Sequence, residues 1–325
     1  MNQDIHTFQS RISYQDQLLP LLEAVIDIYQ IGAYHSHAIL DTGYEDFNVH
    51  LTTNQGEYLL KFFADFRNEA NCKRYVDIMT AVVGAGIKHP QLHQSQQGYL
   101  TKIKLNDAKI RLVVTDFIEG ETFYQLRTKP TLEEQEIIIQ QAAKINQLQI
   151  NPAYVYDSWA VVNFPTEYQN IKDQLTHNDA ILIEPVYKDF LKINIKALPK
   201  CFVHGDIIDT NVIRATSGEI FILDFSVANV YPRIQELAVI LCDLLFDYPN
   251  RVGFEQIYNH ALEIYQNLVK LTDDELKYLP LFIKAAHAMH IIGASKAKVN
   301  GSLSEENNHW IKMGRQGLSF TTNLW

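Results

Sequence analysis

Three polar residues in the second half of the chain have the types and the order that a phosphoryl-transfer site requires. Asp206 lies in a His-Gly-Asp turn, Asn211 follows it, and Asp224 stands at the end of an apolar run. In such a site one carboxylate receives the proton of the attacking hydroxyl, while an amide oxygen and a second carboxylate hold the Mg²⁺ ions that bridge the ATP phosphates. The spacing therefore predicts phosphoryl-transfer chemistry.

The segments around these residues favour a rigid support rather than a surface loop. An apolar stub at 201–203 precedes the turn, and Val212 and Ile213 predict a short strand after it. Residues 216–219 are typical of a hairpin turn, and residues 220–223 form a run with the length of a buried strand. The alternative is an ordinary surface hairpin in which both aspartates are solvated.

A phosphoryl-transfer site also needs a cation at the phosphates, and Lys61 is the candidate. Large apolar residues surround it in a predicted strand, so its ammonium group needs a partner or a cleft. Glu69 and Asp77, on a predicted helix over residues 68–83, are both possible partners, and Glu69 ranks first. The alternative is a solvent-facing edge-strand lysine, with both helix carboxylates solvated.

The composition excludes several function classes. The chain has 325 residues with 47% hydrophobic and 20% charged residues, which is typical of a globular protein with two lobes or domains. A net charge of −10 argues against a nucleic-acid partner. Three widely spaced cysteines without a metal-binding spacing predict reduced thiols. The polar N-terminus and the lack of a long apolar run predict a cytoplasmic protein with no membrane partner.

The order of predicted elements gives an α+β fold with two lobes. Three strands within residues 37–63, the helix at 68–83 and two strands within 98–115 predict a small antiparallel sheet. The rest of the chain is mainly helical. We expect an N-terminal lobe over residues 1–116 and a C-terminal lobe over residues 117–325. The expected C-terminal helices cover 131–148, 176–196, 234–247, 254–271, 273–299 and 304–317.

These motifs resemble those of the aminoglycoside phosphotransferase/choline kinase superfamily, and the layout is similar to type II homoserine kinases and hydroxylysine-kinase-like proteins. The resemblance rests on His204-Gly205-Asp206, Asn211 and Ile222-Leu223-Asp224-Phe225. It implies a protein-kinase-like fold with a nucleotide-binding β-rich lobe and a helical lobe that holds the catalytic loop and the acceptor. ATP and Mg²⁺ are the implied cofactors.

The resemblance also implies a role for each motif residue. Asp206 is the expected catalytic base, braced by His204, and Asn211 and Asp224 are the expected Mg²⁺ ligands. Lys61 is expected to contact the ATP phosphates. Other implied contacts are the loop containing Gly43 over the phosphates, the backbone of Asp116 and Ile118 at adenine, and Glu236 tying its helix to the catalytic loop.

The acceptor is expected to be a small molecule with a hydroxyl group that lies near Asp206. Candidate contacts are Asp209, Asp243, Asp247 and Tyr248. Asp243 and Asp247 form an i,i+4 pair on the predicted helix at 234–247, and an ammonium-bearing acceptor is favoured if they face the cleft rather than solvent.

Several functions stay open at this point. A homoserine-type amino alcohol is the first choice of acceptor, and an aminoglycoside or amino sugar is the second. The alternatives are a catalytically silent, kinase-like scaffold that binds nucleotide, and an unrelated α+β protein. The sequence does not distinguish ATP from GTP and does not give the oligomeric state.

Overall fold

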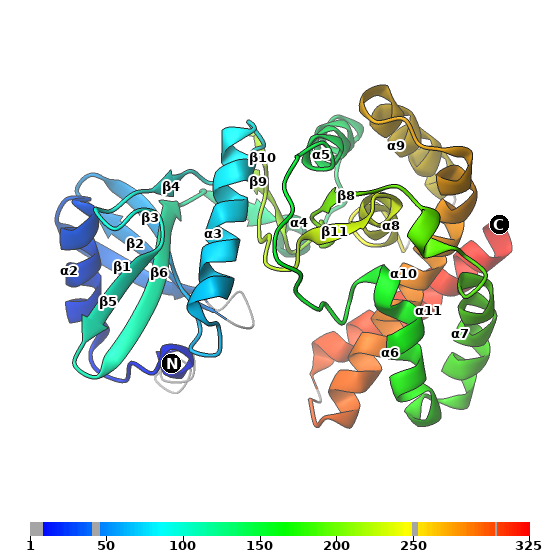
Figure 1. The fold of residues 1–325 in the computed structure, drawn as a ribbon, viewed down its shortest axis with the longest axis horizontal. Helices are drawn as coiled ribbons and strands as arrows, with labels where there is room; N and C mark the ends of the chain where they lie inside the picture. Colours follow the sequence, from blue (N-terminus) through cyan, green and yellow to red (C-terminus); the bar gives the residue numbers. More distant parts are fainter. Residues whose placement is uncertain (1–8, 41–45, 249–252, 303) are drawn as a thin grey trace. The chain divides into compact units, whose positions relative to one another are not determined.

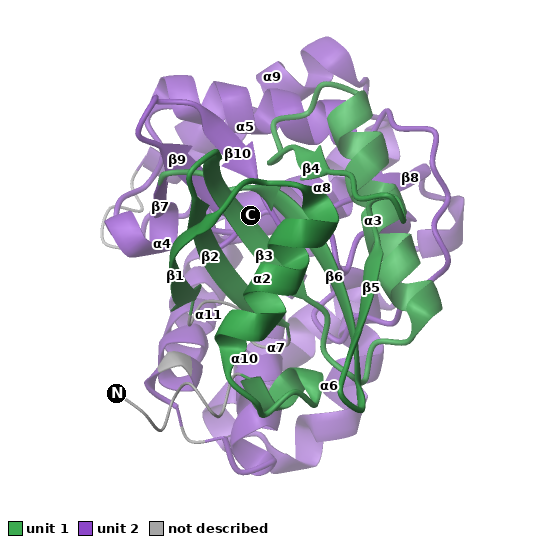
Figure 2. Cartoon of the chain, turned by 90° about the vertical axis from the view of Figure 1, so that its left-hand side faces the viewer, with its two compact units in different colours: residues 1–119 green, residues 120–325 purple. Residues whose placement is uncertain are grey.

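The computed structural model describes residues 9–40, 46–248, 253–302 and 304–325. The chain divides into two compact units between Glu119 and Gly120, shown in green and purple in Figure 2. Unit 1 is a sheet with helices, and unit 2 is mainly helical, so the predicted α+β class is confirmed. Within the described ranges, no helix has both the length and the apolar character that a membrane crossing needs.

Unit 1 contains one antiparallel sheet with the strand order β1-β2-β3-β6-β4, and β5 also pairs with β6. Strands β2 and β3 pair in antiparallel fashion as neighbours along the chain, and so do β5 and β6. The elements of unit 1 are η1 (Ser10–Ile12), α2 (Leu18–Tyr29), β1 (Tyr34–Leu40), β2 (Phe47–Thr53), β3 (Gly56–Phe62), α3 (Glu69–Gly84), β4 (Leu92–His93), β5 (Thr101–Leu105) and β6 (Ala108–Asp116).

The alternation of side chains along β3 places Lys61 on the α3 side of the sheet. Leu60 and Phe62 are fully buried in a cluster with the apolar residues of α2. Because successive strand residues point to opposite faces, Lys61 points the other way, toward α3. Helices α2 and α3 lie on opposite sides of the sheet (Figure 1).

Unit 2 is built from helices and two small antiparallel sheets, β10-β9-β7 and β11-β8. Its strands are β7 (Gly120–Thr122), β8 (Lys200–Val203), β9 (Val212–Ala215), β10 (Ile220–Ile222) and β11 (Asn229–Pro232). Its α-helices are α4 (Phe123–Leu126), α5 (Leu132–Ile145), α6 (Phe164–Ile171), α7 (His177–Phe190), α8 (Ile234–Cys242), α9 (Phe254–Leu268), α10 (Asp273–Val299) and α11 (Glu305–Leu324). Short 3₁₀ turns cover Val161–Asn163, Lys172–Gln174 and Ile195–Ala197.

Helix α10 is the centre of unit 2, where it packs against α6, α7, α8 and α11. Thr272 and Glu275 begin it with reciprocal hydrogen bonds that satisfy N–H groups of the first turn. Most residues in its middle turns are buried on all sides, whereas an amphipathic surface helix buries only one face. The helix therefore provides a rigid core on which α8 and α11 are placed.

The structure corrects the predicted end of the helix that begins at Ile234. Helix α8 ends at Cys242, and Asp243 is its C-cap with φ −115° and ψ −77°. The chain then turns, because the N–H of Leu245 donates to the carbonyl of Ile240 and that of Phe246 donates to Asp243. The expected i,i+4 pairing of Asp243 with Asp247 on one helix is therefore wrong.

Candidate active site

A tight turn after β8 carries the predicted catalytic aspartate. Val203 is buried in the short β8–β11 sheet, and the next residues leave it as His204-Gly205-Asp206. Gly205 has φ 80°, a left-handed conformation that residues with a side chain adopt only with strain. The turn therefore needs glycine at this position to direct Asp206 out of the strand.

His204 connects this turn to the segment that carries Asp224. The backbone N–H of Asp206 donates to Nδ1 of His204 at 3.1 Å, so Nε2 carries the proton and donates to the carbonyl of Leu223 at 2.8 Å. The ring is completely buried, and burial lowers the pKa of His204 to about 4. A neutral imidazole with a fixed tautomer thus holds the two parts of the motif together, as expected of a bracing residue.

Asn211 is anchored directly on Asp206. Its Nδ2 donates to the backbone carbonyl of Asp206 at 3.0 Å and to the carboxylate Oδ2 at 2.7 Å. The backbone carbonyl of Asn211 accepts from the N–H of Leu223 at 2.8 Å, and this bond joins the turn to the end of β10. Since both hydrogens of the amide point to Asp206, the side-chain oxygen is available for another ligand.

Asp224 has a strained backbone. Its φ is 57°, in the left-handed region that non-glycine residues rarely occupy. Its Oδ1 accepts from the N–H of Ser226 at 3.1 Å, which stabilises the turn locally. Backbone strain of this kind persists only where the surroundings enforce it, and it is concentrated at functional sites.

Negative charges converge on Asp206. Burial, followed by the charges of Asp157, Asp224 and Asp243, raises the pKa of Asp206 to about 8. Asp157, on the irregular segment before α6, was not predicted from the sequence because nothing local marks it as a neighbour of the motif. Oxygen donors from two carboxylates and an amide fit a hard divalent cation such as Mg²⁺, which would also offset this charge.

Glu236 ties α8 to the catalytic turn. Its carboxylate accepts from the backbone N–H groups of His204 at 2.7 Å and Gly205 at 3.0 Å, and from Nδ2 of Asn146 at 3.0 Å. It is completely buried, and burial raises the pKa of Glu236 to about 7 although these donors act against the rise. The predicted tie between this helix and the loop is confirmed.

Three of the four predicted acceptor contacts lie close together. The N–H of Asp209 donates to Oδ1 of Asp243 at 2.9 Å. Burial raises the pKa of Tyr248, and the charges of Asp243 and Asp209 add to the rise. Oδ1 of Asp209, Oδ2 of Asp243 and the hydroxyl of Tyr248 are buried without a hydrogen-bond partner among the described residues. The fourth, Asp247, is half-buried beyond the turn that ends α8.

A lysine adjoins this group. Nζ of Lys129 donates to the backbone carbonyl of Asp243 at 2.8 Å. Burial and the charge of Asp243 raise the pKa of Asp209 to about 7, and the charge of Lys129 acts in the opposite direction. The group therefore combines two buried carboxylates with a cation at its edge, an arrangement that can bind a ligand with charges of both signs.

In unit 1, Lys61 pairs with Asp46 and not with the predicted partners. Its Nζ lies 3.4 Å from Oδ2 of Asp46 and 5.0 Å from the centre of the Tyr75 ring. Glu69 is exposed and pairs with Lys102 at 2.6 Å, and Asp77 is exposed and pairs with Lys73 at 2.6 Å.

The prediction that Glu69 orients Lys61 is corrected for a simple reason. The residues that α3 turns toward the sheet are apolar ones such as Tyr75 and Val76, and they belong to its buried face. Asp46 reaches Lys61 instead because it directly precedes β2, the strand that pairs with β3. Asp46 is only 5% exposed and also binds Arg67 at 2.9 Å.

Of the remaining predicted nucleotide contacts, the structure describes Asp116 and Ile118. The N–H of Asp116 donates to the carbonyl of Gln91 at 2.9 Å, so it is engaged, and its carboxylate lies 2.7 Å from Nε2 of His93. Ile118 follows the end of β6 and is half-buried. Gly43 lies outside the described residues.

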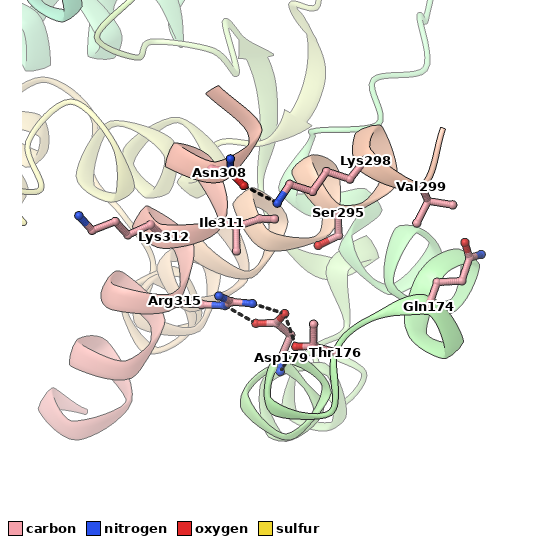
Figure 3. A pocket seen from close by; sticks show the side chains of 10 residues that line it. All are labelled: Gln174, Thr176, Asp179, Ser295, Lys298, Val299, Asn308, Ile311, Lys312 and Arg315. Carbon is pink, nitrogen blue, oxygen red and sulfur yellow. Dashed lines mark hydrogen bonds and ion pairs between the residues drawn. The ribbon is translucent and has the colours of Figure 1, made fainter. Parts of the chain in front are cut away.

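A pocket on unit 2 contains none of these residues. It lies among α7, α10 and α11. Figure 3 shows that the guanidinium of Arg315 pairs with the carboxylate of Asp179 in its lining. Nε and Nη2 of Arg315 lie 2.6 and 2.7 Å from the two carboxylate oxygens. This pair joins α11 to the first turn of α7 and is best explained as structural.

Comparison with solved structures gives the same fold. An amicoumacin kinase in complex with AMP-PNP and Ca²⁺ is 16% identical, with 99% of this chain and 97% of that chain covered and a TM-score of 0.67. A microcompartment-associated aminopropanol kinase is 11% identical (94% and 97% covered, TM-score 0.68). The choline kinase from Streptococcus pneumoniae is 12% identical (93% and 99% covered, TM-score 0.58). The fold is thus one that small-molecule kinases use.

The family follows from the sequence itself. The family model described as "Phosphotransferase enzyme family" matches residues 38–272, which is most of the chain. The protein belongs to this family and is a small-molecule phosphotransferase. The resemblance inferred from the motif around Asp206 is therefore confirmed.

Proposed function

We propose that the protein transfers the γ-phosphoryl group of ATP, bound with Mg²⁺, to a hydroxyl group of a small amino-bearing metabolite. The observation that carries this proposal is the network in which Asn211 fixes Asp206 while His204 fixes both Asp206 and the segment before Asp224. A preformed arrangement of a base and two oxygen ligands is the machinery that such a transfer needs.

Asp206 acts as the base in this reaction. The acceptor oxygen forms a bond to the γ-phosphorus, the bond from that phosphorus to the ADP oxygen breaks, and the hydroxyl proton passes to the carboxylate of Asp206. Oδ2 of Asp206 already accepts from Asn211, so the other oxygen is the natural site for the acceptor hydroxyl.

The side-chain oxygens of Asn211 and Asp224 would hold the Mg²⁺. The ion supplies positive charge that offsets the charge developing on the phosphates. The strained backbone of Asp224 and the hydrogen bonds of Asn211 fix these two donors in advance, which reduces the ordering that binding requires.

Unit 1 is proposed to bind the nucleotide and unit 2 to carry the catalytic loop and the acceptor. Lys61 would contact the phosphates, and its pairing with Asp46 would hold its head group in place. The backbone of Asp116 and of Ile118 supplies the proposed adenine contacts. The N–H of Asp116 is engaged by Gln91 and its carbonyl accepts from the Thr115 hydroxyl at 3.2 Å, so the second lone pair of that carbonyl is the atom proposed to contact adenine.

The buried carboxylates of Asp209 and Asp243 support an ammonium group on the acceptor. Each has an oxygen without a partner among the described residues, and an ammonium ion offers three donors to such oxygens. Lys129, next to Asp243, would pair with a carboxylate on the same molecule. An ammonium and a carboxylate together favour a hydroxy amino acid of the homoserine type, and an aminoglycoside or amino sugar comes second.

Acceptor kinetics with matched compounds test this choice. We expect homoserine to be a better acceptor than an amino alcohol without a carboxylate, and Lys129→Met to remove this difference. Loss of one charge-assisted contact is worth about 1.5–3 kcal/mol, or roughly 10- to 100-fold in kcat/KM for homoserine. Equal use of both compounds by the wild type would rule out the role of Lys129, and turnover only with aminoglycosides would establish the second choice.

A further inference from the structure

A second group of ligand-type side chains lies inside unit 2. Cys242 is the last residue of α8, and His287 and His290 lie on α10. Sγ of Cys242 is 3.2 Å from Nδ1 of His287 and 4.0 Å from Nδ1 of His290. One ligand atom from each of the three residues lies within 4.8 Å of the other two.

The positions of the two histidines follow from helix geometry. Residues three apart on a helix share one face, so His287 and His290 both point toward the end of α8. Their exposures are 0% and 9%, and that of Cys242 is 1%. An imidazole nitrogen and a thiol sulfur are both donors that a metal ion such as zinc accepts.

The surroundings enclose the group. The ring of Phe246 lies edge-on to His287 at 4.9 Å, and Trp310 of α11 lies 4.8 Å from His290. Gly317 lets α11 approach His287, because a Cβ at that position would lie 2.2 Å from Nδ1. A thiol from α8 and two imidazoles from α10 make a compact donor set, and aromatic side chains enclose it.

The imidazole of His287 has no hydrogen-bond partner among the described residues other than Cys242. Nε2 of His287 is buried and has no hydrogen-bond partner among the described residues. No described residue at Nε2 fixes the tautomer, so the proton can lie on Nε2, and Nδ1, 3.2 Å from Sγ of Cys242, then has a lone pair.

We propose that Cys242, His287 and His290 form a Zn²⁺ site that fastens the end of α8 to α10. Sulfur and imidazole nitrogen are the donors that zinc prefers, with distances of about 2.3 Å to sulfur and 2.0–2.1 Å to nitrogen. The ligand atoms lie within 4.8 Å of one another, a separation compatible with one shared ion. On binding, a Zn–S bond forms and the thiol proton of Cys242 leaves to solvent.

The site is distinct from the proposed phosphate and Mg²⁺ site, and its metal content is measurable whether or not the protein turns over substrate. Cys242 directly precedes Asp243, so zinc would also fix the backbone next to this carboxylate, which is proposed to bind the acceptor.

Metal titration of the full chain tests the proposal. Chelator-treated protein is titrated with Zn²⁺ against a chromophoric competitor, and with Co²⁺ as a spectroscopic probe. We expect one tightly held equivalent of zinc, a sulfur-to-cobalt charge-transfer band, and a higher melting temperature with zinc, as ligand binding to the native state requires. Cys242→Ser should remove the band, whereas Cys72→Ser, which alters another buried thiol, should keep it.

His290→Ala guards against a folding defect in Cys242→Ser. His290 lies at the edge of the group, and this variant should fold, as judged by circular dichroism, yet lose the tight zinc equivalent. His177→Ala, at an exposed position on α7, should bind like the wild type. Absence of a tight equivalent in the wild type, or the same band in Cys242→Ser and the wild type, would show that the group is a packed thiol–imidazole contact.

Discussion

The amide of Asn211 holds both the backbone and the side chain of Asp206, with Nδ2 at 3.0 Å from the carbonyl and 2.7 Å from Oδ2. The two residues therefore form one rigid unit, because neither can shift without breaking a bond to the other. This unit would fix the proposed base and the proposed metal ligand relative to each other before any substrate binds, which is the condition for efficient positioning.

The proposed metal role of Asp224 predicts a changed Mg²⁺ dependence in Asp224→Asn. The amide is a weaker ligand than the carboxylate, although asparagine tolerates the left-handed backbone at φ 57°. We expect ATP to raise the melting temperature of this variant only at much higher Mg²⁺. Thermal shift with ATP across a Mg²⁺ series measures this, and an unchanged Mg²⁺ midpoint would exclude Asp224 as a ligand.

The role of Lys61 predicts a loss of rate in Lys61→Met. Methionine keeps much of the aliphatic stem that packs near Tyr75 but removes the charge. We expect kcat/KM for ATP to fall roughly 10²-fold or more, the order seen when one donor to a reacting oxyanion is lost. Lys73→Met, which removes an exposed lysine on α3, is the matched control and should have the kinetics of the wild type.

Glu236 predicts a combined loss of stability and rate. In Glu236→Gln one acceptor oxygen becomes an NH₂ group that faces the backbone N–H of His204 or Gly205. The free energy of unfolding should fall by about 1–3 kcal/mol, and kcat should fall more than the affinity for ATP. Denaturant unfolding and single-turnover kinetics test this, and a variant with wild-type values in both would contradict the positioning role.

The ion pair between the buried carboxylate of Asp179 on α7 and the exposed guanidinium of Arg315 on α11 predicts that stability depends on pH in the acid range. Burial alone would raise the pKa of Asp179, but the hydrogen bonds from Arg315 and Thr176 outweigh it and lower the pKa below its usual range. A lowered pKa stabilises the native state fully above the usual aspartate pKa near 4, and this contribution is lost as the pH falls through the lowered value.

Asp179→Asn should therefore cost about 1–3 kcal/mol at pH 7, and the difference from the wild type should shrink below pH 4. Asp189→Asn, at an exposed pair with Lys192, is the control and should cost less than about 1 kcal/mol. Urea unfolding at several pH values measures both variants. A cost for Asp179→Asn that stays constant down to the lowest pH at which the protein is folded would be evidence against the pair.

Local patterns in the sequence were enough to predict the central motif. Asp206, Asn211 and Asp224 lie on a turn and a hairpin whose geometry depends on near neighbours, and α10 has the predicted bounds Asp273–Val299. The end of α8 was not predicted, because Leu244, Leu245 and Phe246 continue the apolar pattern beyond it, and only the backbone turn at Asp243 shows where the helix stops.

Contacts between segments that are distant along the chain could not be predicted from the sequence. Asp46 lies next to Lys61 only because β2 pairs with β3. The two predicted partners, Glu69 and Asp77, are exposed and pair with other lysines. The charge of Asp157 reaches Asp206 from an irregular segment without any pattern. Strands as short as β4 carry too few residues for a periodicity to show.

The measurement that tests the central claim most directly is ATP consumption with Mg²⁺ across a panel of hydroxyl compounds, with Asp206→Asn and Asp189→Asn in parallel. We predict turnover with an amino-bearing acceptor, homoserine first. It should fall about 10²- to 10⁴-fold in Asp206→Asn, with nucleotide binding retained, and stay unchanged in Asp189→Asn. Full turnover in Asp206→Asn would contradict the assignment of the base. Neither turnover nor an ATP-dependent thermal shift in the wild type would contradict the proposed function.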